Sequence, residues 1–290
     1  MAVASEDASE YRQALERRGV EVTEAPAEVV LADPDRIVDL DFDHVRWVQS
    51  TWAGVDSVDW SRLPPDVVVT GLPGLFGAQM AEFVFAYLLG RSQRVPERHR
   101  TRTWDTTVPS LLDGSLLGIL GAGSIGGGIA TVARAFGMTI RGCRRTGRPD
   151  ERYDEMFGLA DVAEFAGGVD HLVAVLPHTR ETEGIIDGAL LARLGPGATF
   201  INVGRGATAI TDDVVRSVES GQLGLAVLDV TDPEPLPAEH AAWKTPGIVI
   251  TGHTAAHSRT DEVAGFFVAN LERYMQGERL RGVIDRERGY

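Results

Sequence analysis

The sequence predicts an α/β protein built around a doubly wound parallel sheet. The first observation is a glycine-rich turn, in which Gly121, Gly123 and Gly126 follow the apolar run 116–120 in the spacing GxGxxG. Apolar residues at helical intervals come next, followed by a second apolar run at 138–143, so the order is strand, turn, helix and strand. The second observation is that short apolar runs alternate with helical segments along the chain, which is typical of a parallel sheet covered by helices.

The glycine turn predicts a dinucleotide site. In such a motif the first glycine makes the tight turn, the second lets a pyrophosphate approach the backbone, and the third lets helix and strand pack closely. N–H groups at the start of the helix then donate to the phosphates. We expect the cofactor to contact residues of the turn and one residue at the end of a later strand: Gly121, Gly123, Ser124, Ile125, Gly126 and Pro177.

About the first 80 residues predict a smaller α/β unit. A helix is expected over 8–18, ended by Gly19. Strands are expected at 2–5, 20–22, 29–31, 45–49 and 67–70. Because this unit has no phosphate-binding motif of its own, we expect it to hold substrate rather than nucleotide.

The rest of the chain predicts the nucleotide domain. A strongly apolar helix over 78–91 is expected to be buried and to join the two domains, with the basic segment up to Trp104 as its solvated continuation. The helix after the glycine turn is expected to bury one apolar face, made of Ile125, Ile129, Val132 and Phe136. Further strands are expected at 170–176, 198–203, 223–230 and 248–251, with helices at 189–193 and 211–220.

A last helix, over 260–276, is expected to pack back on the first unit, which makes the substrate domain discontinuous in sequence. The expected substrate domain therefore comprises 1–78 and 258–290. The dinucleotide-binding domain comprises 79–257. The two chain crossings, near Ala78 and Ser258, are expected to form a hinge.

The composition is that of an ordinary soluble protein, with 43% hydrophobic and 24% charged residues in 290. No apolar run is long enough to cross a bilayer, and no export signal is recognisable, so we expect a cytoplasmic protein without a membrane partner. Cys143 is the only cysteine, which excludes an internal disulfide and a cysteine metal cluster. We expect no metal.

The net charge of −14 disfavours nucleic acid as a partner, because nucleic-acid binding depends on basic surface. The basic residues are almost all arginine, with Lys244 the only lysine. Codon composition and an acidic, salt-adapted surface both explain this bias, and the sequence does not separate them.

Polar residues follow three of the expected strands of the nucleotide domain. They are Arg205, then Asp229 and Glu234, then His253. Ligands of doubly wound sheets lie outside the carboxyl ends of the strands, so these side chains are expected at the cofactor edge. An arginine binds a carboxylate through its planar fork, and a histidine beside a carboxylate exchanges protons near neutral pH. Together they predict a catalytic group.

The end of the strand at 138–143 predicts the choice of cofactor. Enzymes that use NAD place an acidic residue about twenty positions after the turn, to bind the ribose 2′-hydroxyl. Here the strand leads into Arg144, Arg145 and Thr146. Because arginines pair with a 2′-phosphate, we expect NADP(H) to be preferred, with NAD(H) as the weaker cofactor.

Four motifs, GILGAGSIG, NVGRGA, LDVTDPEPLP and TGHTAAH, in this order and spacing, resemble the D-isomer-specific 2-hydroxyacid dehydrogenase family. The likeness spans essentially the whole chain and includes STWAGVD in the first unit. The C-terminal VIDRERGY most resembles the glyoxylate/hydroxypyruvate reductase branch. The resemblance implies a Rossmann nucleotide domain, a smaller flavodoxin-like α/β substrate domain and a homodimer built largely on the nucleotide domain.

The resemblance also implies a role for each site residue. Arg205 would bind the carboxylate and carbonyl oxygen of a 2-oxo acid, His253 would donate the proton, and Glu234 would pair with His253 and raise its pKa. Asp229 would lie near the nicotinamide carboxamide. The loop whose backbone N–H groups receive the substrate carboxylate would be Ala53, Gly54 and Val55.

The chain departs from the family pattern at two positions. Gly252 stands where the family usually has proline, and Trp52 is a bulky residue in the substrate loop, where it either narrows the pocket or packs between domains. The expected activity is reduction of a small 2-oxo acid to a D-2-hydroxy acid. The alternatives are another dehydrogenase of the family, such as a phosphoglycerate or formate dehydrogenase, and a weakly catalytic dinucleotide-sensing protein. Glu234 argues against the formate branch, which resembles this chain but has glutamine there.

Overall fold

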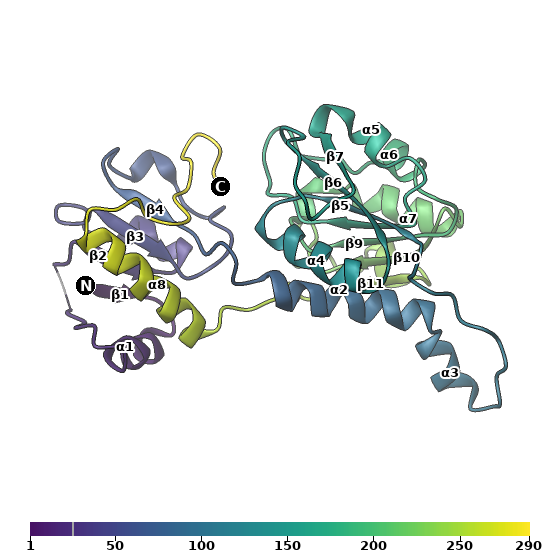
Figure 1. Ribbon diagram of the computed structural model, residues 1–290, viewed down its shortest axis with the longest axis horizontal. Coiled ribbons are helices and arrows are strands. Elements are labelled where there is room, and N and C mark those ends of the chain that lie inside the picture. Colours follow the sequence, from purple (N-terminus) through teal and green to yellow (C-terminus); the bar gives the residue numbers. More distant parts are fainter. Residues whose placement is uncertain (25) are drawn as a thin grey trace. The chain divides into compact units, whose positions relative to one another are not determined.

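The protein is described by a computed structural model that covers residues 1–24 and 26–290 and forms two compact units (Figure 1). The smaller unit comprises Met1–Phe76 and His257–Tyr290, and the larger unit comprises Gly77–Ala256. Both are α/β units with parallel sheets, and the smaller one is discontinuous in sequence. The predicted fold class is confirmed. None of the helices in the described residues combines the length and apolar character that a bilayer crossing requires.

The larger unit contains one sheet of seven parallel strands. These are β5 (Leu116–Leu120), β6 (Thr139–Arg144), β7 (Glu155–Gly158), β8 (His171–Ala174), β9 (Ala198–Asn202), β10 (Leu223–Leu228) and β11 (Ile248–Ile250). Their order is β11-β10-β9-β8-β5-β6-β7. The chain runs outward from β5 to β7 and then returns to the other side of β5 at β8. The carboxyl ends of β5 and β8 therefore form the switch point at which such sheets bind ligands. Strand β7 is an edge strand that the sequence prediction missed.

Helices cover this sheet: α2 (Gly77–Ser92), α4 (Ser124–Ala135), α5 (Val162–Phe165), α6 (Gly188–Leu191) and α7 (Thr211–Glu219). The basic segment does not continue α2 as expected. Arg94 adopts a left-handed backbone with φ 55°, which ends α2 and starts a separate short helix, α3 (Val95–Thr101). In Figure 1, α3 and the segment that follows it project from the body of the larger unit.

The prediction of the buried face of α4 is wrong in part. Ile129 is fully buried, but Phe136 lies beyond the helix, is partly exposed and stacks on Phe85 of α2 with ring centroids 5.0 Å apart. The reason is that α4 packs closely on α2: a Cβ added to Gly128 would lie 2.6 Å from the Cα of Gly77. Such a contact requires small residues. The buried positions are Gly126, Gly127, Ile129, Ala130 and Ala133.

The smaller unit contains four parallel strands, in the order β1-β2-β3-β4. They are β1 (Ala2–Ala4), β2 (Val29–Ala32), β3 (Trp47–Ser50) and β4 (Val68–Thr70), with helices α1 (Ala8–Glu16) and α8 (Thr260–Met275). Trp47 of β3 is fully buried and stacks on Phe267 of α8, with ring centroids 5.3 Å apart, and its Nε1 donates to Thr70 Oγ1 at 2.8 Å. These contacts explain why the C-terminal helix belongs to this unit.

The strand expected at 20–22 does not form. The segment runs next to β1, where the N–H of Thr23 donates to the carbonyl oxygen of Met1 at 2.8 Å. The N–H of Val20, however, closes helix α1 by donating to the carbonyl oxygen of Leu15, and residues 20–24 stay partly or fully exposed. Without a buried face, the segment has too little apolar contact to be held as a regular strand.

Candidate active site

The glycine turn after β5 has the shape that a dinucleotide requires. Gly121 has φ 113°, and a Cβ there would lie 2.5 Å from the carbonyl oxygen of Val175, after β8. A Cβ on Gly126 would collide with the carbonyl oxygen of Gly121. By contrast, a Cβ on Gly123 would meet no atom within 4 Å, so the outer face of the turn is open in front of the first residues of α4. That open face is where a pyrophosphate approaches the backbone. The residues present therefore fit the cofactor.

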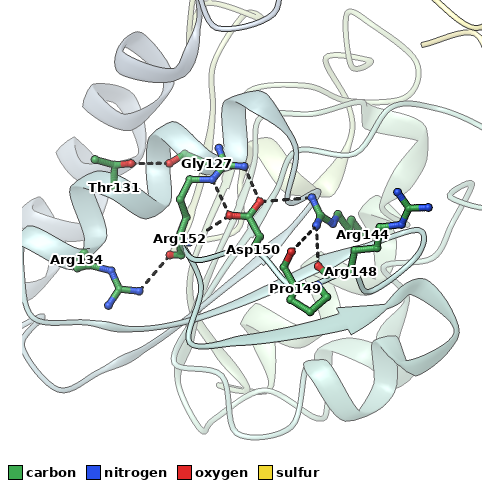
Figure 2. A network of polar contacts seen from close by, with 8 residues as sticks. All are labelled: Gly127, Thr131, Arg134, Arg144, Arg148, Pro149, Asp150 and Arg152. Atoms are coloured by element: carbon green, nitrogen blue, oxygen red, sulfur yellow. Dashed lines mark hydrogen bonds and ion pairs between the residues drawn. The ribbon is translucent and has the colours of Figure 1, made fainter.

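The end of β6 lies directly against this turn, because the carbonyl oxygen of Cys143 accepts the N–H groups of Gly121 and Ala122, each at 2.9 Å. Arg144 follows, and its guanidinium is already engaged by the protein. Nη1 lies 3.5 Å from Asp150 Oδ2, and Nη2 donates at 2.7 Å to the carbonyl oxygen of Arg148 (Figure 2). Arg145 and Thr146, in contrast, are exposed.

Asp150 binds a second arginine, Arg152, through both carboxylate oxygens. Arg152 Nε donates to Oδ1 at 2.9 Å and Nη2 donates to Oδ2 at 2.6 Å. The hydrogen bonds from Arg152 lower the pKa of Asp150 to about 2, and the charge of Arg144 contributes to the same direction. The carboxylate is therefore ionised at neutral pH.

Arg205 lies in the loop after β9. Asn202, the last residue of β9, shapes the loop: its Oδ1 accepts the N–H of Gly204 and its Nδ2 donates to the carbonyl oxygen of Arg205, both at 3.1 Å. A Cβ on Gly206 would collide with the backbone of Thr231, so this loop packs against the loop after β10. The Arg205 backbone is thus held at the carboxyl edge of the sheet.

Asp229, directly after β10, is buried and its carboxylate accepts three hydrogen bonds. Oδ1 accepts the hydroxyl of Thr251 at 2.5 Å and the N–H of Thr254 at 2.9 Å, and Oδ2 accepts the N–H of Ala255 at 3.0 Å. The backbone oxygen of Asp229 accepts the N–H of His253 at 2.8 Å. Asp229 therefore fastens the loop after β11, and with it His253, to the end of β10.

His253 and Glu234 form a hydrogen-bonded pair. His253 Nδ1 lies 3.1 Å from Glu234 Oε2, and Glu234 Oε1 accepts the N–H of Thr231 at 3.0 Å. Both side chains of the pair are about half exposed, so the ring is open to a substrate. His253 has φ 57°, a left-handed conformation that costs a non-glycine residue roughly 1–3 kcal/mol. The hydrogen bond from the N–H of His253 to Asp229 maintains this conformation. Because Nδ1 pairs with Glu234, Nε2 is the ring nitrogen that is not bound to Glu234.

A cavity of about 350 Å³ opens beside this pair. Its wall is partly carboxylate and partly apolar, and the residues that line it are Asp229, Thr231, Glu234, Pro235, Leu236, Trp243, Ile250, Thr251, Gly252 and His253. The predicted proton donor thus stands at the edge of a recess of a size that admits a small molecule.

The predicted substrate loop of the smaller unit follows β3. The hydroxyl of Thr51 donates to buried Asp33, and the hydroxyl of Ser258 donates to the carbonyl oxygen of Thr51 at 2.5 Å. Ser50 Oγ and Trp52 exchange two further hydrogen bonds. Across the described part of the chain, no hydrogen bond involves the backbone N–H groups of 53–55. These donors are free to receive an anion.

Sequence reasoning missed the groups that support the site. Asp150 and Arg152 lie in a polar stretch without periodicity, so no local signal marked them. Asp33 could have been found, because it follows a buried strand in the same way as Asp229 does in the larger unit. Ser258 is separated from its partner Thr51 by 207 positions, and only the folded chain shows the contact.

Comparison with known proteins decides the family. Residues 85–255 match the sequence profile of the D-isomer specific 2-hydroxyacid dehydrogenase NAD-binding domain. The chain belongs to the D-isomer-specific 2-hydroxyacid dehydrogenase family. Membership confirms the resemblance inferred from the motifs, and it confirms that the larger unit is a nucleotide domain.

Relatives within this dehydrogenase family match most or all of the chain. Glyoxylate/hydroxypyruvate reductase A of Serratia proteamaculans is 35% identical over 256 residues, covering 85% of this chain and 82% of that protein. The crystal structure of a family member from Aeromonas salmonicida has a TM-score of 0.87 at 34% identity and covers 98% of both chains. The NADPH-dependent glyoxylate/hydroxypyruvate reductase of Sinorhizobium meliloti, solved with NADP and sulfate, has a TM-score of 0.85 at 27% identity and covers 100% of this chain and 99% of that one.

Proposed function

We propose that this dehydrogenase transfers a hydride between NADP(H) and a small 2-oxo or D-2-hydroxy acid, with glyoxylate and hydroxypyruvate as the foremost substrates. The observation that carries the proposal is the His253–Glu234 pair, 3.1 Å apart, at the edge of the sheet that bears the glycine turn. The similarity to the reductases of Serratia and Sinorhizobium supports the choice of substrate.

In the direction of reduction, His253 donates a proton to the carbonyl oxygen of the substrate. Glu234 holds Nδ1, so Nε2 is the nitrogen that carries the transferred proton, and the carboxylate stabilises the charged ring. When bound, the nicotinamide supplies the hydride that adds to the keto carbon. Arg205 binds the substrate carboxylate through its planar fork, which fixes the orientation of the carbonyl group. The backbone N–H groups of 53–55 are also expected to donate to a carboxylate.

The preference for NADP(H) rests on the loop after β6. None of residues 144–146, at the end of that strand, is an acidic residue that could bind a ribose 2′-hydroxyl, whereas Arg145 and Thr146 are exposed there. Cationic and hydroxyl donors favour a 2′-phosphate. NAD(H), which lacks this phosphate, is expected to bind more weakly.

Oxidation of NADPH, followed by its absorbance across a panel of 2-oxo acids, tests the proposal. We expect the highest kcat/KM with glyoxylate or hydroxypyruvate and a lower kcat/KM with NADH. The variant His253→Asn is expected to lose kcat while keeping its affinity for NADPH, because it removes the proton donor and leaves the glycine turn intact. Tight NADPH binding without turnover on any 2-oxo acid would instead favour the dinucleotide-sensing alternative.

We also propose that the protein is a cytoplasmic homodimer. The segment 102–111, which follows α3, exposes large apolar side chains to solvent: Trp104 at 95%, Val108 at 85% and Leu111 at 69%. Exposed apolar groups gathered on one projecting segment are typical of a protein interface. Light scattering is expected to give twice the chain mass, and Trp104→Ser should lower it. A disulfide-free fold with one buried cysteine suits a reducing compartment, and cell fractionation tests this location.

A further inference from the structure

Four arginines lie in the stretch that follows Cys143, the residue of β6 that contacts the glycine turn. They are Arg144, Arg145, Arg148 and Arg152. They differ sharply in what they contact. Two of them bind Asp150, as Figure 2 shows. The other two, Arg145 and Arg148, are exposed, and among the described residues no hydrogen bond or ion pair involves either guanidinium. In the sequence all four are equivalent cations, whereas in the structure two bind the protein and two face solvent.

Arg144 is folded back onto the loop that follows it. Its Nη2 donates to the carbonyl oxygens of Arg148 at 2.7 Å and Pro149 at 3.3 Å, and its Nη1 faces Asp150. Its Nε is buried and has no hydrogen-bond partner in the ranges 1–24 and 26–290. To reach a ligand outside the loop, Arg144 would have to give up three polar contacts. Its position is therefore that of a residue that holds the loop together.

Arg152 attaches the same loop to helix α4. Besides its bidentate contact with Asp150, its guanidinium lies directly over Gly127, where an added Cβ would collide with Nη1. Arg134 of α4 donates to the carbonyl oxygen of Arg152 at 3.2 Å (Figure 2). Because α4 begins at the glycine turn, the loop is fixed relative to the start of the phosphate-binding helix.

Arg145 and Arg148, whose guanidinium groups are not engaged by the protein, lie in this loop beside the cofactor edge. Thr146 bridges to Gly158 of β7, which fixes the turn after β6, and Gly147 with φ 59° reverses the chain toward Arg148. In Figure 2 the guanidinium of Arg148 extends away from Asp150, whereas that of Arg144 turns toward it. Glu151 is the exposed anion next to this loop, and it leaves Arg145 and Arg148 with an excess of positive charge.

We propose that Arg148, together with Arg145, binds the 2′-phosphate of the cofactor, and that Asp150 is a positioning residue that holds Arg144 out of this contact. The inference rests on the proposed NADP(H) preference and assigns it to particular side chains. It adds Arg148, which the motif at the end of β6 does not include, and it removes Arg144 from direct contact with the phosphate.

Binding of small nucleotides, measured by calorimetry on the full chain, tests this assignment without depending on catalysis. The probes are adenosine 2′,5′-bisphosphate, which carries the 2′-phosphate, and 5′-AMP, which lacks it. Three variants, Arg148→Gln, Arg144→Gln and Arg193→Gln, each remove one positive charge, and Arg193 is an exposed control in the turn that follows α6. Equal loss of charge isolates the effect of position.

We expect Arg148→Gln to raise the Kd of the bisphosphate about tenfold, the loss of roughly one charge-assisted hydrogen bond, with the Kd of 5′-AMP unchanged. Arg144→Gln is expected to change the Kd of the bisphosphate by no more than about threefold, and Arg193→Gln to leave it unchanged. An effect of Arg144→Gln as large as that of Arg148→Gln, or an Arg148→Gln that behaves like Arg193→Gln, overturns the assignment.

The role of Asp150 is tested by coupling. Asp150→Asn releases Arg144, so Arg144→Gln, nearly silent in the wild type, should weaken bisphosphate binding severalfold in the Asp150→Asn background. If Arg144→Gln is silent in both backgrounds, Asp150 does not hold Arg144 away from the ligand. Binding of the two probes to the wild type distinguishes the NADP(H) preference from the assignment of the 2′-phosphate to Arg148. Equal affinity for the two probes refutes the NADP(H) preference itself, whereas a clear preference with an unaffected Arg148→Gln refutes only the assignment made here.

Discussion

Replacing Gly123 by alanine separates the fold of the glycine turn from its function. Gly123 has φ −98°, outside the left-handed region, and an added Cβ would meet no atom within 4 Å. The folded protein should therefore accept the methyl group without strain. The same methyl group, however, occupies the open face over which a pyrophosphate must approach the N–H groups at the start of α4.

The size of the effect follows from the contacts that are lost. Hydrogen bonds to charged groups contribute roughly 1.5–3 kcal/mol each, so displacing a phosphate from one such N–H group raises Kd about 10- to 100-fold. We expect Gly123→Ala to raise the Kd of NADP+ by this factor in calorimetry. The melting temperature should stay within about 1 °C of the wild-type value, since nothing in the protein is displaced.

Two matched variants supply the contrast. In Gly121→Ala and Gly126→Ala, the new methyl group meets the carbonyl oxygens of Val175 and Gly121, and Gly121 also has a left-handed φ of 113°. Both variants should lower the melting temperature clearly. A Gly123→Ala protein that binds NADP+ as tightly as the wild type would refute the reasoning, because the open face would then not be the phosphate site.

Three further predictions test other parts of the structure. Glu234→Gln is expected to lower kcat roughly 100-fold with an unchanged Kd for NADP+, because the carboxylate stabilises the charged ring of His253; unchanged steady-state kinetics would contradict this. Burial lowers the pKa of His171 to about 4, so the unfolded state takes up the proton first as pH falls below about 6.5. The free energy of unfolding should consequently fall by about 1–2 kcal/mol between pH 7 and 5 in urea titrations, and His171→Leu should lack this decrease. If the unfolding free energies of the wild type and His171→Leu change equally with pH, His171 is not the cause of the decrease. Thr51→Val removes the hydrogen bond to Asp33 beneath the substrate loop. This variant should raise the KM for the 2-oxo acid severalfold and leave the Kd of NADP+ unchanged. A raised Kd of NADP+ would mean that the loop supports cofactor binding rather than substrate binding.

Much of the fold was predictable because most strands of the larger sheet are short apolar runs between turns. Strands β5, β8 and β9 are almost entirely buried, so their sequences are mostly apolar. The edge strand β7, with the sequence EMFG, is half exposed and carries no such pattern. The face of α4 was misassigned because the pattern counted large apolar residues, whereas the close contact with Gly77 demands small ones. Periodicity reports hydrophobicity, and it does not report how near a neighbouring helix comes.

The candidate site was predictable to the extent that it follows from sheet topology. Parallel strands bring their carboxyl ends to one edge, so the positions of Asp229, Glu234 and His253 relative to the glycine turn follow from strand order alone. The contacts within the loop after β6 do not. Arg144 and Arg148 are the same residue type, four positions apart, and only the folded loop shows that the guanidinium of Arg144 is engaged by the protein while that of Arg148 is exposed. A carboxylate that contacts a cation in the folded chain removes that cation from the binding site, so a count of arginines near a strand end overstates the charge that a phosphate meets.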